Sequence, residues 1–178
     1  MISTFRVSLS RSFLLAFAIS LLVPIGGTVS TGAPIQGDQA ISIGASGLPL
    51  PRWATISTSR LNLRTGPGDR YPIEWVYQRD GMPIEITAEY QDWLKIRDID
   101  GTEGWVFARY VRDSRSAMIV DRTRTLFQEA AADARPLFRA EAGVHGKLLI
   151  CEEAWCQMLI DGKRGWILRE HIYGAYAG

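Results

Sequence analysis

The fold is decided by Gly101-Thr102-Glu103-Gly104-Trp105-Val106, which returns 61 residues later as Gly162-Lys163-Arg164-Gly165-Trp166-Ile167. In each copy, an apolar run, a polar turn, a Trp (Trp93 or Trp155) and a second apolar run precede the Gly-Trp pair. A repeat of about 60 residues is too long for a solenoid unit and suits a small self-contained β domain. The sequence therefore predicts two copies of one small module, and small duplicated modules usually bind, whereas catalysis usually needs a larger cleft.

The composition is that of an ordinary globular protein, because 47% of the 178 residues are hydrophobic and 22% are charged. The length suits two small domains. The net charge is only +1, and no Lys/Arg run is present. This charge pattern excludes the basic surface that nucleic acids or anionic lipids require.

The N-terminal residues have the pattern that is typical of a secretory signal peptide. Arg6 and Arg11 supply positive charge, residues 13–23 are apolar apart from one Ser, and residues 28–33 offer small side chains for cleavage. The apolar run is shorter than the roughly 18 residues needed to span a bilayer, so a retained membrane helix is the weaker interpretation. We therefore expect residues 1–33 to be a signal peptide and the mature protein to be periplasmic or secreted, without stable membrane insertion.

The two cysteines indicate a disulfide. In an exported chain, Cys151 and Cys156, separated by four residues, can face each other across a hairpin turn. The alternative is a zinc site completed by His145 and His171, but C-x₄-C is not a usual zinc spacing and no second cysteine pair exists. The disulfide is favoured, and a loop this short implies about 2 kcal/mol of stabilisation.

Turn signals and alternating apolar residues divide the rest of the chain into a linker and two domains. Residues 34–52 are rich in Gly, Pro, Ser and Ala and are predicted to form a flexible linker that ends in an extended segment. Residues 53–113 show five or six short alternating segments and one helical turn near Ala108, which predicts a small bent β-barrel. Residues 119–175 repeat this pattern, so the predicted fold class is all-β.

The second copy departs from the first at its opening. Gly66-Pro67-Gly68, a strong turn signal, is replaced by Glu129-Ala130-Ala131. This stretch has helix propensity, but its place in the repeat leads us to expect an irregular loop.

At this level of detail the chain resembles a known family, the bacterial SH3-like (SH3b) domains, in the form found in exported proteobacterial proteins. The resemblance rests on the pattern Asn62-Leu63-Arg64-x-Gly66-Pro67-Gly68, on Trp93, and on the Asp100-Gly101 turn before Gly104-Trp105-Val106. Further features are Leu-Pro-Leu-Pro-Arg before the first strand, Arg-Tyr-Pro-Ile after the glycine loop and the Trp-Cys pair of the second copy. The likeness covers roughly residues 47–178.

The resemblance implies two tandem small β-barrels that bind rather than catalyse. Relatives are often found beside cell-wall hydrolase domains and are thought to hold peptidoglycan or its peptides. Cell-wall peptide or glycan is therefore the expected partner, with a structural or protein-interaction adaptor of the cell envelope as the alternative. An extracytoplasmic sensor lacks support, since no output segment is present.

Catalytic and cofactor patterns are missing from the sequence. Neither His145 nor His171 has a nucleophile placed as in known catalytic arrangements, and paired acids such as Glu152-Glu153 fall in predicted turns. No Gly-rich stretch has P-loop or dinucleotide spacing. We expect no enzyme activity, no cofactor and no metal.

The candidate ligand-binding residues surround the glycine loop of the first copy. The functional interpretation is an aromatic floor with polar residues that read the ligand: Asn62, Arg64, Arg70, Tyr71, Trp75, Tyr77 and Trp93. The alternative is that the rings pack against each other over the barrel end. Strand parity predicts that Trp93 faces away from the core. Trp105 is expected to be a structural lid.

Overall fold

The computed structural model describes residues 42–175. The predicted signal peptide and the linker residues 34–41 lie outside the described residues. Within residues 42–175, no helix is long and apolar enough to cross a membrane.

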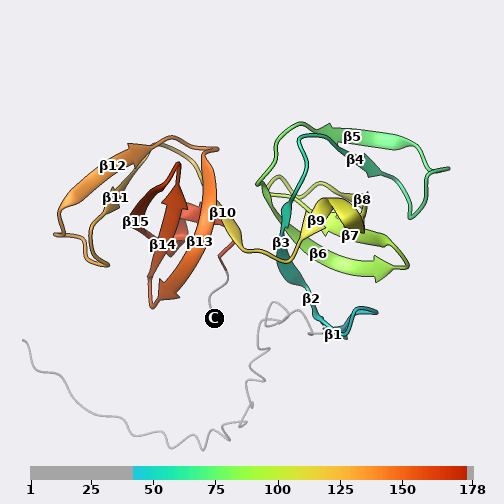
Figure 1. The fold of residues 1–178 in the computed structure, drawn as a ribbon, viewed down its shortest axis with the longest axis horizontal. Helices are drawn as coiled ribbons and strands as arrows, with labels where there is room; N and C mark the ends of the chain where they lie inside the picture. Colours follow the sequence, from blue (N-terminus) through green and yellow to red (C-terminus); the bar gives the residue numbers. More distant parts are fainter. Residues whose placement is uncertain (1–41, 176–178) are drawn as a thin grey trace, which may run out of the picture. The chain divides into compact units, whose positions relative to one another are not determined.

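The first barrel is a seven-stranded antiparallel sheet in the order β5-β4-β8-β7-β6-β3-β9 (Figure 1). Its strands are β3 (Arg52–Ile56), β4 (Leu61–Arg64), β5 (Ile73–Tyr77), β6 (Pro83–Tyr90), β7 (Trp93–Arg97), β8 (Glu103–Phe107) and β9 (Val111–Arg112). The predicted helical turn is confirmed as the 3₁₀ turn η1 (Ala108–Tyr110) between β8 and β9.

The second barrel repeats this topology strand for strand, in the order β12-β11-β15-β14-β13-β10-β16. Its elements are β10 (Ser116–Ile119), β11 (Arg124–Phe127), β12 (Pro136–Ala140), β13 (His145–Glu152), β14 (Trp155–Ile160), β15 (Lys163–Leu168), η2 (Arg169–His171) and β16 (Ile172–Tyr173). The all-β fold of two tandem barrels is therefore confirmed. The second barrel begins at Ser116, slightly before the expected residue 119.

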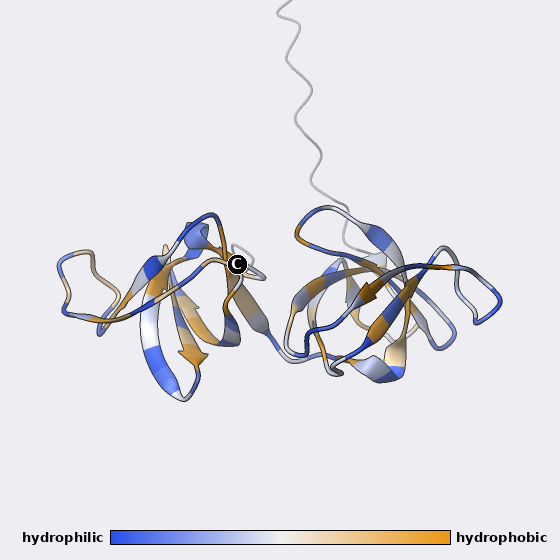
Figure 2. Ribbon diagram, turned by 90° about the horizontal axis from the view of Figure 1, so that it is seen from above, coloured by the Kyte–Doolittle hydropathy of each residue, from blue (hydrophilic) through white to orange (hydrophobic). Residues whose placement is uncertain are grey.

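Each barrel has its own hydrophobic core. Alternation along the strands turns every second residue inward, as in β4, where Leu61 and Leu63 are buried while the residues between and after them are half-exposed. The first cluster includes Leu63, Ile86 and Ile96, and the second includes Leu126 and Met158. Figure 2 shows the resulting change between hydrophobic and hydrophilic colour along single strands.

The glycine of the repeated Gly-Trp pair is explained by close packing between strands. A Cβ atom on Gly104 would lie 2.6 Å from Leu63 Cγ and 3.0 Å from the Arg64 carbonyl oxygen. In the second barrel, a Cβ atom on Gly165 would lie 2.7 Å from Leu126 Cβ. Only glycine lets β8 lie this close to β4, and β15 this close to β11.

The hairpins that precede these glycines differ in length. In the second barrel, Ile160 pairs with Lys163, and the two residues between them, Asp161 and Gly162, have φ values of 48° and 77°. Two positive φ values define the two-residue type I′ turn. In the first barrel, Arg97 pairs with Glu103, so the connection is longer, and only its glycine has a positive φ.

The disulfide between Cys151 and Cys156 is confirmed. The two residues are directly opposite in the β13–β14 hairpin, with a Cα–Cα distance of 4.0 Å. The zinc alternative is thereby excluded for these thiols. The irregular loop expected in place of the glycine loop is also confirmed, because residues 128–135 contain only turns and bends.

The described part of the predicted linker is ordered, which corrects the expectation for residues 42–52. β1 (Ser42–Ile43) and β2 (Pro49–Leu50) form a short hairpin, and β3 already begins at Arg52. Ser46 donates hydrogen bonds from its backbone N and its Oγ to the two carboxylate oxygens of Glu89 on β6, both at 2.7 Å. The composition predicted a flexible linker. It could not reveal the contact that holds this segment, because Glu89 lies 43 positions from Ser46 in the sequence.

Candidate functional site

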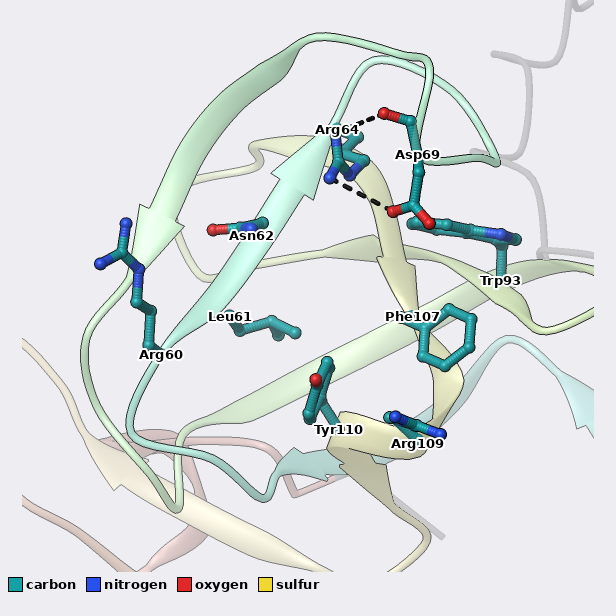
Figure 3. Close-up of a pocket in the computed structure, with 9 residues that line it drawn as sticks. All are labelled: Arg60, Leu61, Asn62, Arg64, Asp69, Trp93, Phe107, Arg109 and Tyr110. Carbon is teal, nitrogen blue, oxygen red and sulfur yellow. Dashed lines mark hydrogen bonds and ion pairs between the residues drawn. The ribbon is translucent and has the colours of Figure 1, made fainter.

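A hollow of about 440 Å³ opens on the first barrel where β4, β7, β8 and η1 meet (Figure 3). We call it the first hollow. It is lined by Arg60, Leu61, Asn62, Arg64, Asp69, Trp93, Phe107, Arg109 and Tyr110.

The arginine on β4 shapes the glycine loop. Arg64 Nη1 donates hydrogen bonds to the carbonyl oxygens of Asp69 at 3.0 Å and Tyr71 at 2.8 Å, and its Nη2 lies 3.3 Å from Asp69 Oδ1. Figure 3 shows the contacts between Arg64 and Asp69 at one side of the hollow. Since these contacts occupy its guanidinium group, Arg64 serves first to position the loop.

Three aromatic rings lie next to one another in the lining of the first hollow. Trp93 and Phe107 are paired across β7 and β8, and their ring centroids are 5.3 Å apart in an edge-to-face arrangement. Tyr110 on η1 continues the series, 6.2 Å from Phe107. Edge-to-face packing of this kind rigidifies a wall against which an apolar group can lie.

The exposure of Trp93 differs from the expectation. The residue lies outside the core cluster of Leu94 and Ile96, in agreement with strand parity, yet it is only 8% exposed. Phe107, opposite it on β8, covers one edge of the indole. Parity gives the face on which a side chain lies but does not show what covers that face.

Two cations at the rim make no ion pair within residues 42–175. Arg60 and Arg109 are exposed and lie on different sides of the first hollow, as Figure 3 shows. The guanidinium carbon of Arg109 is 5.2 Å from the centroid of the Phe107 ring, which orients it by a cation–π contact. Asn62 Oδ1 is buried and has no hydrogen-bond partner in the described part of the chain. The first hollow thus offers two guanidinium groups and an aromatic wall.

Of the seven predicted binding residues, the first hollow brings together Asn62, Arg64 and Trp93. Tyr71 packs its ring over Gly66, where a Cβ atom has no room, and Arg70 hydrogen-bonds to the Tyr71 hydroxyl at 3.4 Å. These contacts give the glycine loop a structural role.

The other two predicted residues lie on β5. Tyr77 is buried and donates a hydrogen bond of 2.8 Å to Asp98 Oδ2. Burial, together with this hydrogen bond, raises the pKa of Tyr77 above its ordinary value. Trp75 is 58% exposed and lines a different hollow beside Asp98 and Asp100. The four aromatic residues therefore do not form one continuous floor.

Six of the nine lining residues were not predicted as site residues from the sequence: Arg60, Leu61, Asp69, Phe107, Arg109 and Tyr110. The helical turn at 108–110 was predicted, but its position beside β4 depends on barrel closure, which strand spacing does not reveal. Within residues 42–175, no three His, Cys, Asp or Glu side chains are grouped as metal ligands.

Residues 57–113 and 121–174 each match the family Bacterial SH3 domain. The two matches together cover more than half of the chain, and each begins just after the first strand of its barrel, β3 or β10. The chain therefore belongs to the bacterial SH3 domain family, in two tandem copies. No curated protein matches it.

Solved structures with a partly similar fold include three NlpC-type proteins. They are NlpC2 from Trichomonas vaginalis (11% identity over 71% of this chain and 49% of that chain, TM-score 0.33), an NlpC/P60 family protein from Bacillus cereus ATCC 10987 (13%, 68%, 55%, TM-score 0.32) and NlpC1 from Trichomonas vaginalis (12%, 79%, 51%, TM-score 0.33). The chain spans about half the length of each.

Proposed function

We propose that this chain is an exported, non-catalytic binding protein that holds cell-wall peptides in its first hollow. The family supplies the general role of a binding module. The observation that carries the proposal is the pair Arg60 and Arg109, two rim guanidinium groups without an ion-pair partner in the described structure, facing an aromatic wall.

The chemistry of the rim suits a ligand with carboxylates on a short peptide. Arginine binds carboxylates in a two-pronged geometry, and hydrogen bonds to charged groups contribute about 1.5–3 kcal/mol each. The wall of Trp93, Phe107 and Tyr110 would contact the apolar part of the same peptide. Wall peptides carry free carboxylates on small side chains, and they match both features.

Sedimentation with purified sacculi tests this proposal. The double variant Arg60→Ala/Arg109→Ala should bind at least tenfold more weakly than the wild type, because two charged contacts are lost. Binding should also weaken as salt concentration rises.

The matched control is Arg135→Ala/Arg139→Ala, which removes the same charge from exposed positions of the second barrel. It should bind like the wild type. Equal affinity of both double variants for a soluble wall peptide, which lacks glycan, would exclude the first hollow as the wall-peptide site.

A second candidate function is that of an envelope adaptor, favoured by the exposed apolar surface of β5. Ile73 is 47% exposed and Trp75 is 58% exposed on this edge strand of the first sheet. Edge strands with exposed apolar residues can pair with partner proteins. Crosslinking in cells distinguishes the two functions, because a protein partner would remain attached after enzymatic digestion of the wall.

A further inference from the structure

The second barrel has a hollow of about 340 Å³ at the position equivalent to the first hollow. We call it the second hollow. The equivalence follows from strand register: Trp93 pairs with Phe107 in the first barrel, and Trp155 pairs with Leu168 in the second. The last lining residue comes in each case from the 3₁₀ turn, as Tyr110 on η1 and His171 on η2.

The side chains of the second hollow differ systematically from those of the first. Phe127 occupies the strand position of Arg64, since Phe127 pairs with Trp166 on β15 as Arg64 pairs with Trp105 on β8. The rings of Phe127 and Trp155 meet edge to face, with centroids 5.9 Å apart. Both residues are partly exposed, so this aromatic pair forms a surface that a ligand can reach.

Of the two guanidinium groups that line the second hollow, one is paired within the barrel, since Arg124 Nη2 lies 3.6 Å from Asp121 Oδ2. His171 Nε2 lies 3.3 Å from Glu170 Oε1. Burial, followed by the positive charge of Arg124, lowers the pKa of His171 below its ordinary value, which favours the neutral imidazole. Only Arg122 at the rim makes no ion pair in residues 42–175. The second hollow therefore does not repeat the pair of open cations seen in the first.

The remaining polar groups suit hydroxyl and amide partners. Thr123 and Thr125 line the second hollow with hydroxyls that both donate and accept hydrogen bonds. The neutral imidazole of His171 adds a group that can donate or accept, depending on its tautomer. A flat aromatic surface with uncharged hydrogen-bonding groups at its edge matches a sugar ring, which has apolar C–H faces and equatorial hydroxyls.

We propose that the second hollow binds an uncharged sugar ring of a glycan chain. This inference rests on the proposed cell-wall function and adds a second ligand class, so that the first barrel holds peptide and the second holds glycan.

The indole N–H signals of the full exported chain provide a direct test by NMR. Trp93 reports on the first hollow and Trp155 on the second, while Trp166, which is absent from both linings, serves as an internal control. Titration with the soluble tetramer of N-acetylglucosamine should shift the Trp155 signal saturably and leave Trp93 in place. A carboxylate-bearing wall peptide should shift Trp93, and this second titration tests the proposed function separately.

Two variants sharpen the test. Thr123→Val/Thr125→Val keeps the shape of the side chains and should weaken binding of the tetramer about tenfold, because two neutral hydrogen bonds are lost. Phe127→Ala should weaken it at least as much, provided that the Trp166 signal shows an intact barrel. Arg60→Ala/Arg109→Ala should leave the tetramer titration unchanged.

The sugar proposal is overturned if the tetramer leaves Trp155 unshifted or if it shifts Trp93 alone. It is also overturned if the threonine variant binds the tetramer like the wild type. A peptide that shifts Trp155 while the tetramer does not would make the second hollow a peptide site.

Discussion

At the scale of single residues, the glycine of the Gly-Trp pair carries a strict steric requirement in each barrel. Gly104→Ala would place a methyl group 2.6 Å from Leu63 Cγ and 3.0 Å from the Arg64 carbonyl oxygen. Because a backbone atom cannot move away as a side chain can, the variant should destabilise the first barrel by about 1–3 kcal/mol, the usual range for overpacking. Chemical denaturation of the variant measures this loss.

The control for this substitution lies on the same hairpin. Gly101 has a φ of 80°, and a Cβ atom there would meet nothing within 4 Å. Asn tolerates this left-handed conformation, so Gly101→Asn should cost clearly less than Gly104→Ala. If both variants lost the same stability, backbone conformation rather than close packing would explain why Gly104 and Gly165 occupy the same position in the two copies.

Residue-scale features were predictable from the sequence where they depend on local spacing. Alternation placed Leu61 and Leu63 in the core and Trp93 on the opposite face. The burial of Trp93 could not be predicted, because it depends on Phe107, which is paired with it across two strands. Likewise, Arg109 enters the candidate site only because η1 returns beside β4 when the barrel closes.

At the scale of elements, the β1–β2 hairpin is held to the first barrel by Leu50 on β2, which is buried in the first core cluster, and by one carboxylate near the hairpin turn. Glu89 has a side chain that is only 4% exposed, and it lies 2.7 Å from Arg52 Nη1 as well as accepting both hydrogen bonds from Ser46. Burial alone would raise the pKa of Glu89. The hydrogen bonds from Ser46 and the contact with Arg52 outweigh it and hold the pKa below 4.5.

This arrangement predicts that the turn of the hairpin around Ser46 loosens in acid, while Leu50 stays in the core. Because the pKa of Glu89 is lowered in the folded state, its contribution is fully present above about pH 4.5 and is lost as the pH falls through the lowered value. The backbone N–H signal of Ser46, followed by NMR from pH 6 to pH 2, should therefore move with a midpoint below 4.5.

Two substitutions test the assignment. Glu89→Gln removes the titrating charge, so the Ser46 signal should no longer respond to pH in this range. Glu74→Gln, at an exposed position of β5, should leave the response of the wild type intact. A persistent transition in Glu89→Gln would show that another acid holds the hairpin.

At the scale of the whole molecule, one framework carries two different surfaces. The strand orders of the two sheets are identical, and the hollows lie at the same place in each. What differs is the chemistry at matched positions, such as Arg64 and Phe127, or Tyr110 and His171. Loss of the glycine loop from the second copy therefore removed one loop conformation but left the hollow in place.

The disulfide provides a test of how far the stabilities of the two barrels are independent. Cys151 and Cys156 bridge β13 and β14, and Cys156 belongs to the second core cluster, which shares no residue with the first. Reduction of the wild-type protein should therefore destabilise the second barrel by at most about 2 kcal/mol, the estimate for so short a loop, and leave the first barrel unchanged.

Reduction is the better perturbation here, because Cys156 is fully buried and a serine in its place would add an unsatisfied hydroxyl to the core. Hydrogen exchange of the strand amides, measured with and without reductant, reports on each barrel separately. Faster exchange confined to β13–β15 would show that each core is stable by itself. An equal increase in β6–β8 would mean that the barrels unfold as one cooperative unit, and the two hollows could then not be lost independently of each other.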